Sequence, residues 1–330
     1  MSELLRVEGV TKTFAVGGPM WNRRRVKALS DVTFGLERGR TFGLVGESGS
    51  GKSTLGRCIL GLIRPDSGVV TFDGKDVQSL NRRELAEFRQ RVQPVFQDPF
   101  GSLDPRWSVG RSVAEALDAG RIGTALDRDR RVAELFDRVG LNPSLAKRLP
   151  SALSGGQRQR VGIAAALASS PELIVADEPV SALDVSVQAQ ILNLFMDLQA
   201  DLGVATVFIT HDLGVVEHVS DEVAVMYLGR IVERGEVAAV IEKPAHPYSQ
   251  ALMDAIPNPD PERRREHRPL PGEIPSPITP PPGCAFHPRC PLAIDKCSDQ
   301  RPALTAIGSS REVACHVVVE NYRLAKTPSH

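Results

Sequence analysis

Hydrophobic and polar positions alternate along two stretches near the start of the chain. Leu5 and Val7 alternate with polar neighbours, and Val32, Phe34 and Leu36 repeat the pattern. A period of two residues is typical of strands, because successive side chains point to opposite faces. The two stretches therefore predict antiparallel strands at the start of the fold.

Strand-like and helix-compatible segments then follow one another along the chain. Thr41 to Val45 leads through a glycine-rich turn into a helix-compatible stretch from Lys52 to Leu62. Strand-like runs return at Leu173 to Ala176 and at Thr206 to Thr210, with a helix-compatible stretch from Val185 to Leu202 between them. Because this alternation is typical of parallel sheets covered by helices, we expect an α/β fold.

A second pattern of hydrophobic residues predicts helices in the middle of the chain. Val132, Leu135, Phe136 and Val139 follow the i, i+3, i+4, i+7 spacing of one helix face. We therefore expect a helical insertion at about residues 99–160 of the α/β core.

The composition of the sequence changes towards the end of the chain. Val223 to Tyr227 and Ile231 to Glu233 flank a Leu-Gly-Arg turn and predict a hairpin, after which a last helix is expected. Nine prolines between Pro269 and Pro291 are too many for regular elements and predict an extended linker. We expect one domain at residues 1–257 and a C-terminal extension at residues 258–330.

Composition limits the classes of function. The 40 Lys and Arg residues balance the 40 Asp and Glu residues, so no overall charge attracts nucleic acid. The N-terminus lacks the features of a secretory signal, and apolar runs such as Val161 to Ala168 are far shorter than the roughly 18 residues of a membrane span. We expect a chain that stays in the cytoplasm and reaches a membrane through a partner.

The segment from Gly46 to Ser53 fits the pattern G-x-x-x-x-G-K-[ST] between a predicted strand and a predicted helix. Such a loop surrounds phosphate oxygens with backbone N–H groups, while Lys52 reaches the β- and γ-phosphates and Ser53 binds Mg²⁺. The alternative, a glycine-rich turn with a chance lysine, does not explain the flanking elements. The expected nucleotide-binding residues are Gly46, Ser48, Gly49, Ser50, Gly51, Lys52, Ser53 and Thr54.

Asp177 and Glu178 end an apolar predicted strand. Ligands of α/β proteins bind at the carboxyl ends of strands, so both carboxylates are expected at the site. Asp177 would hold Mg²⁺, and Glu178 would be the general base that orients and deprotonates the attacking water. Alone, the pair would be two surface acids at a strand end; the phosphate loop favours the catalytic interpretation.

A second anion-binding motif, Leu-Ser-Gly-Gly-Gln, spans Leu153 to Gln157. Ser154 is a good N-cap for the helix that follows, and Gly155 and Gly156 leave the helix N-terminus accessible. A single chain does not need two such sites for one phosphate. The motif resembles the signature of the ABC ATPase family, in which two domains dimerise head to tail and the signature of one closes over the γ-phosphate bound to the other.

The resemblance implies roles for further residues. Gln97 matches the glutamine that contacts the Mg²⁺ site and joins the helical insertion to the core, and His211 matches the histidine that contacts the γ-phosphate. Asp184 matches an aspartate of the dimer interface. Phe14 lies where the family has an aromatic ring that stacks on adenine. Simpler alternatives are a core position for Phe14, a helix cap for His211 and a surface amide for Gln97.

Three stretches, at residues 96–106, 246–252 and 283–290, resemble the ATPases of bacterial dipeptide and oligopeptide importers. The resemblance implies an ATPase subunit at the cytoplasmic face of the inner membrane, paired with a copy or a paralogue. Its partners would be two transmembrane permease subunits and an extracytoplasmic peptide-binding protein. Nickel or glutathione is the alternative cargo. A soluble ABC ATPase of nucleic-acid metabolism is disfavoured by the neutral net charge and by the absence of coiled coils or tandem domains.

Four of the five cysteines lie in the C-terminal extension. A proline-rich tail buries little apolar surface, so a metal centre would help to fix its shape. No C-x₂₋₄-C pair of the zinc type is present, whereas the resemblance to peptide-importer ATPases implies a four-iron, four-sulfur cluster. Zinc, with His287 or His316 as ligands, and free thiols are the alternatives. Cys58 is expected to be a buried core residue. The expected cluster ligands are Cys284, Cys290, Cys297 and Cys315.

Overall fold

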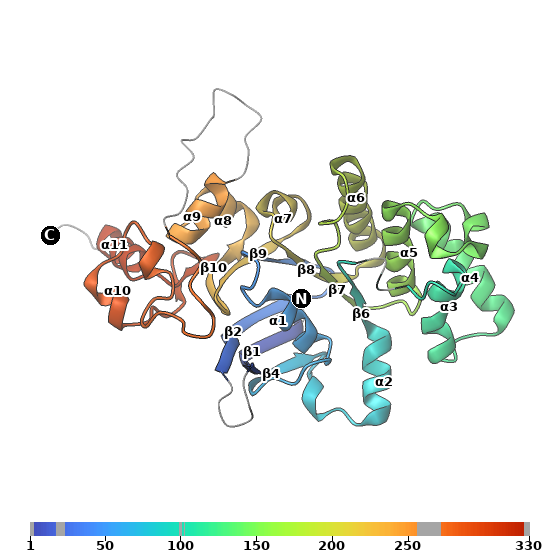
Figure 1. The fold of residues 1–330 in the computed structure, drawn as a ribbon, viewed down its shortest axis with the longest axis horizontal. Helices are drawn as coiled ribbons and strands as arrows, with labels where there is room; N and C mark the ends of the chain where they lie inside the picture. Colours follow the sequence, from blue (N-terminus) through green and yellow to red (C-terminus); the bar gives the residue numbers. More distant parts are fainter. Residues whose placement is uncertain (1–2, 18–23, 99–100, 102, 256–271, 327–330) are drawn as a thin grey trace.

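The computed structural model of the chain describes residues 3–17, 24–98, 101, 103–255 and 272–326. Two β-sheets lie in the middle of the molecule, and groups of helices lie around them (Figure 1). The helical insertion extends from one end and the C-terminal segments gather at the other (Figure 1). The predicted α/β class is confirmed.

The smaller sheet is antiparallel, with the strand order β2-β1-β4-β5. Val7 of β1 lies opposite Phe34 of β2, and both side chains are buried. The antiparallel strands predicted from the alternating pattern are therefore confirmed. Their bounds are β1 (Glu3–Val16), β2 (Arg24–Glu37), β4 (Ser67–Phe72) and β5 (Lys75–Asp76).

The larger sheet has the strand order β11-β12-β10-β9-β3-β8-β7-β6. From β9 to β6 the neighbouring strands are parallel. Every residue of β3 and of β8 is buried, as expected for strands covered on both faces. The bounds are β3 (Thr41–Val45), β6 (Val92–Val95), β7 (Leu173–Asp177), β8 (Ala205–Thr210), β9 (Glu222–Tyr227), β10 (Arg230–Glu236), β11 (Thr305–Ala306) and β12 (Arg311–Val313).

Two hydrophobic layers cover the larger sheet. On one face, Leu55 and Ile59 of α1 share a core with the smaller sheet. On the other face, Phe195 of α6 contacts Phe208 of β8 edge to face, with ring centroids 5.4 Å apart. Both predicted core helices are confirmed, and they lie on opposite sides of the sheet (Figure 1). The helices of this region are α1 (Lys52–Ile59), α2 (Arg82–Arg91), α6 (Val185–Leu202) and α7 (Leu213–Val219).

The predicted helical insertion forms helices that bury the expected residues. Val132, Leu135 and Phe136 are buried on one side of α4, and Val139 is buried at its C-terminal end. Thr124 caps the start of this helix in a capping box. The elements are α3 (Val109–Ala119), α4 (Ala125–Arg138), two short 3₁₀ turns η2 (Pro143–Lys147) and η3 (Pro150–Ala152), and α5 (Gly155–Leu167).

The predicted hairpin is confirmed as β9 and β10. Its two turn residues, Leu228 and Gly229, have φ values of 43° and 79°, as a tight turn between twisted strands requires. The Gly229 N–H donates to the carbonyl oxygen of Ser50 over 2.8 Å. The hairpin therefore supports the backbone of the predicted phosphate loop.

The C-terminal segments continue the larger sheet. Glu233 of β10 lies opposite Val313 of β12, and β11 pairs with β12. The described part of the proline-rich segment, residues 272–291, has turns and the 3₁₀ turn η5 but no strand. The predicted boundary at residue 257 lies outside the described residues, as do residues 99, 100 and 102. The remaining helices are α8 (Val237–Glu242), α9 (Pro247–Asp254), η5 (His287–Arg289), α10 (Asp295–Asp299) and α11 (His316–Lys326).

Among the described residues, no helix combines the length and the apolar character that a membrane span requires. Cys58 is fully buried on α1, as predicted.

Candidate functional site

The predicted phosphate loop connects β3 to α1. Gly46 and Gly51 have φ values of 152° and 105°. A Cβ atom on Gly51 would lie 2.3 Å from the carbonyl oxygen of Ala28, so only glycine fits at this position. Lys52 is the first residue of α1. The loop is thus followed directly by a helix N-terminus, which favours a bound anion.

Lys52 lies almost entirely within this loop, with 4% of its surface exposed. Its Nζ atom donates to the carbonyl oxygens of Gly46 and Glu47 over 2.6 and 3.0 Å. Burial lowers the pKa of the Lys52 ammonium, and the nearby carboxylates of Glu178, Asp177 and Glu47 oppose this shift. The loop therefore holds a desolvated positive charge beside its own backbone.

Ser53 and Asp177 form an oxygen pair next to this lysine. The Ser53 hydroxyl donates to Asp177 Oδ1 over 3.0 Å. Burial at the end of β7 is the main cause that raises the pKa of the Asp177 carboxyl. A divalent cation would offset the cost of burying this carboxylate, and oxygen ligands of this kind suit Mg²⁺.

Glu178 is the point at which three predicted residues meet. Gln97 Nε2 lies 3.1 Å from Glu178 Oε2, and His211 Nδ1 lies 3.4 Å from the same oxygen. The Gln97 amide also donates to the Ser181 hydroxyl over 3.3 Å. The backbone of Glu178 has a φ of 47°, and its N–H donates to the carbonyl oxygen of Ile209 over 2.8 Å. The carboxylate is therefore held by side chains from two different segments, and the backbone of Glu178 is held by Ile209.

A cavity of about 840 Å³ brings these groups together. Its volume is within the range of small-molecule sites. Gly46, Ser50 and Asp177 do not line it; Ser50 is buried, and Asp177 is held next to the cavity by Ser53. Leu252 of α9 and Pro277 of the extension also line the cavity; sequence reasoning missed both, because no motif marks them. The predicted residues that line it are Phe14, Ser48, Gly49, Gly51, Lys52, Ser53, Thr54, Gln97, Glu178 and His211.

Phe14 lies on β1 at the side of this cavity. It faces Val26 of β2 across the strand pair, and Val26 and Ala28 line the same cavity. Lys12 Nζ lies 5.6 Å from the centroid of the Phe14 ring. The ring is partly exposed rather than a core residue, so the predicted stacking on adenine stays a prediction that this position allows.

The Ser-Gly-Gly-Gln motif and Asp184 do not line the cavity. Ser154 caps α5 in a capping box with Gln157, whose backbone N–H lies 3.2 Å from the Ser154 hydroxyl. Asp184 caps α6 and accepts from the Val187 N–H over 3.0 Å. A Cβ atom on Gly156 would lie 2.5 Å from Val187, so α5 and α6 approach closely there. Gly155 begins α5. These residues form a second group at two neighbouring helix N-termini.

The four C-terminal cysteines lie within electrostatic range of one another. Burial is the main cause that raises the pKa of the Cys290 thiol to about 11, and the thiols of Cys315, Cys284 and Cys297 add to the shift. The Cys284 N–H donates to the Cys297 carbonyl oxygen over 2.8 Å. His287 and His316 each lie 2.9 Å from a backbone carbonyl oxygen.

Among the described residues, however, no group of three or more His, Cys, Asp or Glu side chains is arranged to hold a metal ion. The expectation of a metal-binding, iron–sulfur centre is therefore not supported by a ligand group in the structure.

Comparison with known protein families gives two matches. The model described as "ABC transporter" matches residues 29–181. The model described as "Oligopeptide/dipeptide transporter, C-terminal region" matches residues 232–297.

Curated relatives match over almost the whole chain. The probable peptide ABC transporter ATP-binding protein y4tS of Sinorhizobium fredii is 52% identical and covers 95% of this chain and 90% of its own length. The putative oligopeptide transport ATP-binding protein YkfD of Bacillus subtilis is 47% identical and covers 98% of this chain and 97% of its own length.

Solved structures share the fold of the core. The ATP-binding cassette MJ0796, in a dimeric post-hydrolysis state bound to ADP and Pi, aligns with a TM-score of 0.64 and 30% identity over 71% of this chain and 99% of that chain. The protein cbiO1 of Clostridium perfringens, part of the ABC transporter complex cbiONQ, aligns with a TM-score of 0.64 and 29% identity over 74% of this chain and 92% of that chain.

Proposed function

The chain belongs to the family of ABC transporter ATP-binding proteins, and we propose that it hydrolyses Mg·ATP to power the import of dipeptides or oligopeptides. The match at residues 232–297 to the C-terminal region of oligopeptide/dipeptide transporters supports this cargo class. The names of relatives that cover almost the whole chain support it as well. No observation favours nickel or glutathione as the cargo.

The arrangement around Glu178 is the observation that carries the hydrolysis. Lys52, the loop N–H groups and the start of α1 bind the phosphates, and Ser53, Asp177 and Gln97 are the residues that would hold Mg²⁺. When bound, the ion neutralises charge on the phosphate oxygens. Glu178 orients the attacking water and accepts its proton. His211 lies 3.4 Å from Glu178 and would contact the γ-phosphate.

The second group of residues acts on a neighbouring subunit in this proposal. Ser154, Gly155, Gly156, Gln157 and Asp184 lie outside the chain's own cavity. They are at helix N-termini, which bind anions. In a head-to-tail dimer they would face the γ-phosphate bound by the other subunit, a copy or a paralogue. The dimeric state of the related cassette supports this arrangement.

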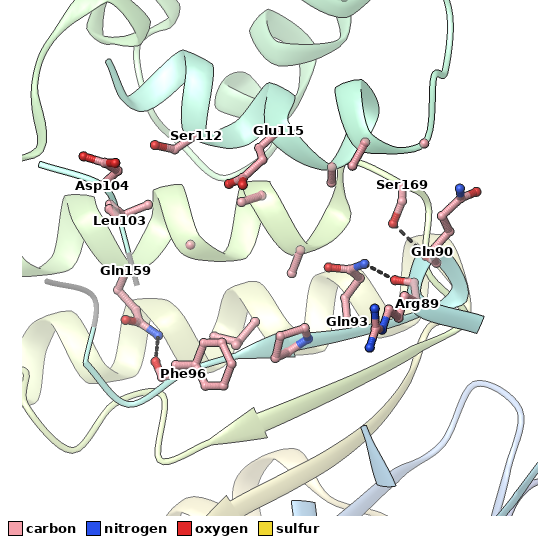
Figure 2. Close-up of a pocket in the computed structure, with 18 of the residues that line it drawn as sticks. Arg89, Gln90, Gln93, Phe96, Leu103, Asp104, Ser112, Glu115, Gln159 and Ser169 are labelled. Carbon is pink, nitrogen blue, oxygen red and sulfur yellow. Dashed lines mark hydrogen bonds between the residues drawn. The ribbon is translucent and has the colours of Figure 1, made fainter. Parts of the chain in front are cut away.

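A groove beside the helical insertion is the proposed contact with a permease subunit. It has a volume of about 490 Å³ and lies between α3, α5, β6 and the end of α2 (Figure 2). Phe96, which is 42% exposed, and Leu103 give it an apolar wall, and Arg89 and Glu115 lie at its edge. We propose that a short amphipathic helix on the cytoplasmic side of the permease occupies it.

The position of this groove would couple transport to hydrolysis. Phe96 directly precedes Gln97, and Gln159 Nε2 of α5 lies 3.5 Å from the Phe96 carbonyl oxygen (Figure 2). A helix seated here would therefore contact the segment that carries Gln97 to Glu178. The chain would then be peripheral at the cytoplasmic face of the inner membrane, and a peptide-binding protein would deliver cargo on the other side.

We also propose that Cys284, Cys290, Cys297 and Cys315 hold a four-iron, four-sulfur cluster. Backbone N–H groups beside the thiols of Cys284, Cys290 and Cys315 lower the pKa of each thiol against the effect of burial, and N–H groups near sulfur tune cluster-bound thiolates. Zinc holds its thiolates about 2.3 Å from one point, whereas the corners of a cluster need more widely spaced ligands. The absence of a C-x₂₋₄-C pair among these four cysteines supports the cluster over zinc.

Metal analysis tests the cluster. After anaerobic purification we expect about four iron and four sulfide per chain, and a loss of both in Cys290→Ser but not in the control Cys58→Ala. Stoichiometric zinc without sulfide, or no metal, would refute the cluster and leave the ATPase function intact.

Transport is tested in vesicles that contain the complete importer. Labelled dipeptides and oligopeptides should accumulate only with ATP and the binding protein, and the importer with Glu178→Gln should not accumulate them. ATP-driven uptake of nickel or glutathione without peptide uptake would overturn the proposed cargo.

A further inference from the structure

The C-terminal extension contacts the phosphate loop through one arginine. Arg289 lies in η5, next to Cys290, and its side chain is 7% exposed. Its Nη1 atom lies 3.2 Å from Glu47 Oε2, and it approaches the Tyr227 hydroxyl to 3.5 Å. Glu47 follows the first glycine of the phosphate loop. The ion pair therefore joins two segments that are 242 residues apart in the sequence.

Glu47 is also held through its backbone. Its N–H donates to the hydroxyl of Tyr248, a fully buried residue of α9, over 2.9 Å. The rings of Tyr227, Tyr248 and Phe286 pack together, with centroids 4.7 to 5.5 Å apart. The backbone of Glu47 is thus held by Tyr248 of this aromatic cluster, and its carboxylate by Arg289, which itself approaches Tyr227 of the cluster.

The position of Glu47 matters for nucleotide binding in two ways. Its carbonyl oxygen accepts from Lys52 Nζ over 3.0 Å, so it sets where the phosphate-binding ammonium rests. Glu47 also lines the cavity. An unpaired carboxylate there would repel a triphosphate, because like charges in a partly buried site interact strongly.

We propose that Arg289 is a positioning residue of the nucleotide site, which neutralises and immobilises Glu47 so that the C-terminal extension sets the affinity for ATP. The inference rests on the proposed function only in taking ATP as the nucleotide. Arg289 does not touch Glu178, Gln97 or His211. The proposal therefore assigns it an effect on binding rather than on the chemical step.

Nucleotide binding by the purified full-length chain tests this role. Arg289→Gln should weaken ATP binding by about tenfold, within the range of coupling between linked sites, with kcat at saturating ATP within about twofold of the wild type. Arg289→Lys keeps the charge and should bind ATP more tightly than Arg289→Gln. The control Arg301→Gln removes an exposed arginine of the same extension that does not line the cavity, and its affinity should equal that of the wild type.

The decisive variant combines two substitutions. Arg289→Gln with Glu47→Gln removes the unpaired carboxylate, so ATP affinity should recover to within about threefold of the wild type. A purely structural role for Arg289 predicts no such recovery. Unchanged affinity in Arg289→Gln, or no recovery in the double variant, would overturn the proposal. Failure of the wild type to bind ATP would instead refute the proposed function.

Thermodynamic linkage between ATP binding and the stability of the extension gives a second, independent measurement. If the extension strengthens ATP binding, ATP must stabilise the extension by the same factor. We expect ATP to slow amide hydrogen exchange at residues 284–290 by several-fold in the wild type and to have a clearly weaker effect in Arg289→Gln. Equal protection in both chains would contradict the coupling.

Discussion

Glu178 has a backbone conformation that non-glycine residues rarely adopt. Its φ of 47° lies in the left-handed region, which costs roughly 1–3 kcal/mol and persists only where the surroundings hold it. Here the hydrogen bond from its N–H to Ile209 and the contacts of its side chain with Gln97 and His211 hold it. Glycine would relieve the strain but would remove the carboxylate. The strained position is therefore tied to the role of Glu178 as a base.

The first prediction concerns this carboxylate. Glu178→Gln should leave ATP binding intact and lower steady-state turnover by about a hundredfold or more, because the general base is lost. Lys52→Ala should instead weaken binding, since it removes the charge that faces the phosphates. Hydrolysis by Glu178→Gln near the wild-type rate would rule out its assigned role. Equilibrium binding and phosphate release distinguish the two variants.

His246 makes the stability of the fold depend on pH. It is buried at the start of α9, where its Nδ1 accepts from the Tyr248 N–H over 3.0 Å, and burial lowers its pKa to about 3. The unfolded chain binds a proton near pH 6.5 and the folded chain does not. The free energy of unfolding should therefore fall as the pH drops below about 6.5, by up to about 1.4 kcal/mol per pH unit.

A matched variant isolates this contribution. His246→Asn keeps an acceptor for the Tyr248 N–H and removes the titration. Between pH 7 and pH 5, denaturant unfolding of the wild type should lose about 1–2 kcal/mol more than the variant. Parallel pH profiles of the two chains would show that His246 does not contribute.

At the scale of elements, the hydrophobic periodicity of the sequence predicted those strands and helices that local sequence pattern determines. The strand and the helix that flank the phosphate loop, the helix Val185–Leu202 and the hairpin at Leu228 all agree with the structure. The pairing of β12 with β10 could not be predicted, because three residues of strand carry almost no periodic signal. The contact between Arg289 and Glu47 could likewise not be predicted from the sequence, since no short-range pattern links the two residues. For the same reason Leu252 and Pro277 were missed at the cavity.

The separation of the two anion-binding elements gives the next prediction. A fusion of two copies in tandem can carry Lys52→Ala in one half and Gly156→Asp in the other, or both in the same half. Head-to-tail pairing leaves one complete site only in the first case, with up to about half of the wild-type fusion's activity. The second fusion should be inactive. The reverse order of activities would mean that each chain completes its own site.

At the scale of the whole molecule, the C-terminal extension is part of the core. β12 extends the larger sheet at β10, and Phe286 packs against Tyr227 and Tyr248. The extension also supplies Pro277 to the nucleotide cavity. The proline-rich composition of the extension suggested an appendage, because proline-rich segments have no periodic pattern that reveals long-range packing. The contacts instead favour one cooperative unit that includes the nucleotide site.

The variant Phe286→Ala tests whether the extension and the nucleotide site unfold as one unit. The side chain is 1% exposed, so its truncation should lower the free energy of unfolding by about 3–5 kcal/mol. The control Leu292→Ala removes a side chain of the same extension that is 44% exposed, and its effect should stay within about 0.5 kcal/mol. Because ATP stabilises whichever unit contains its site, thermal unfolding should show a single transition that ATP raises and Phe286→Ala lowers. Two transitions, of which the ATP-dependent one is unaffected by Phe286→Ala, would mean that the extension folds as a separate domain.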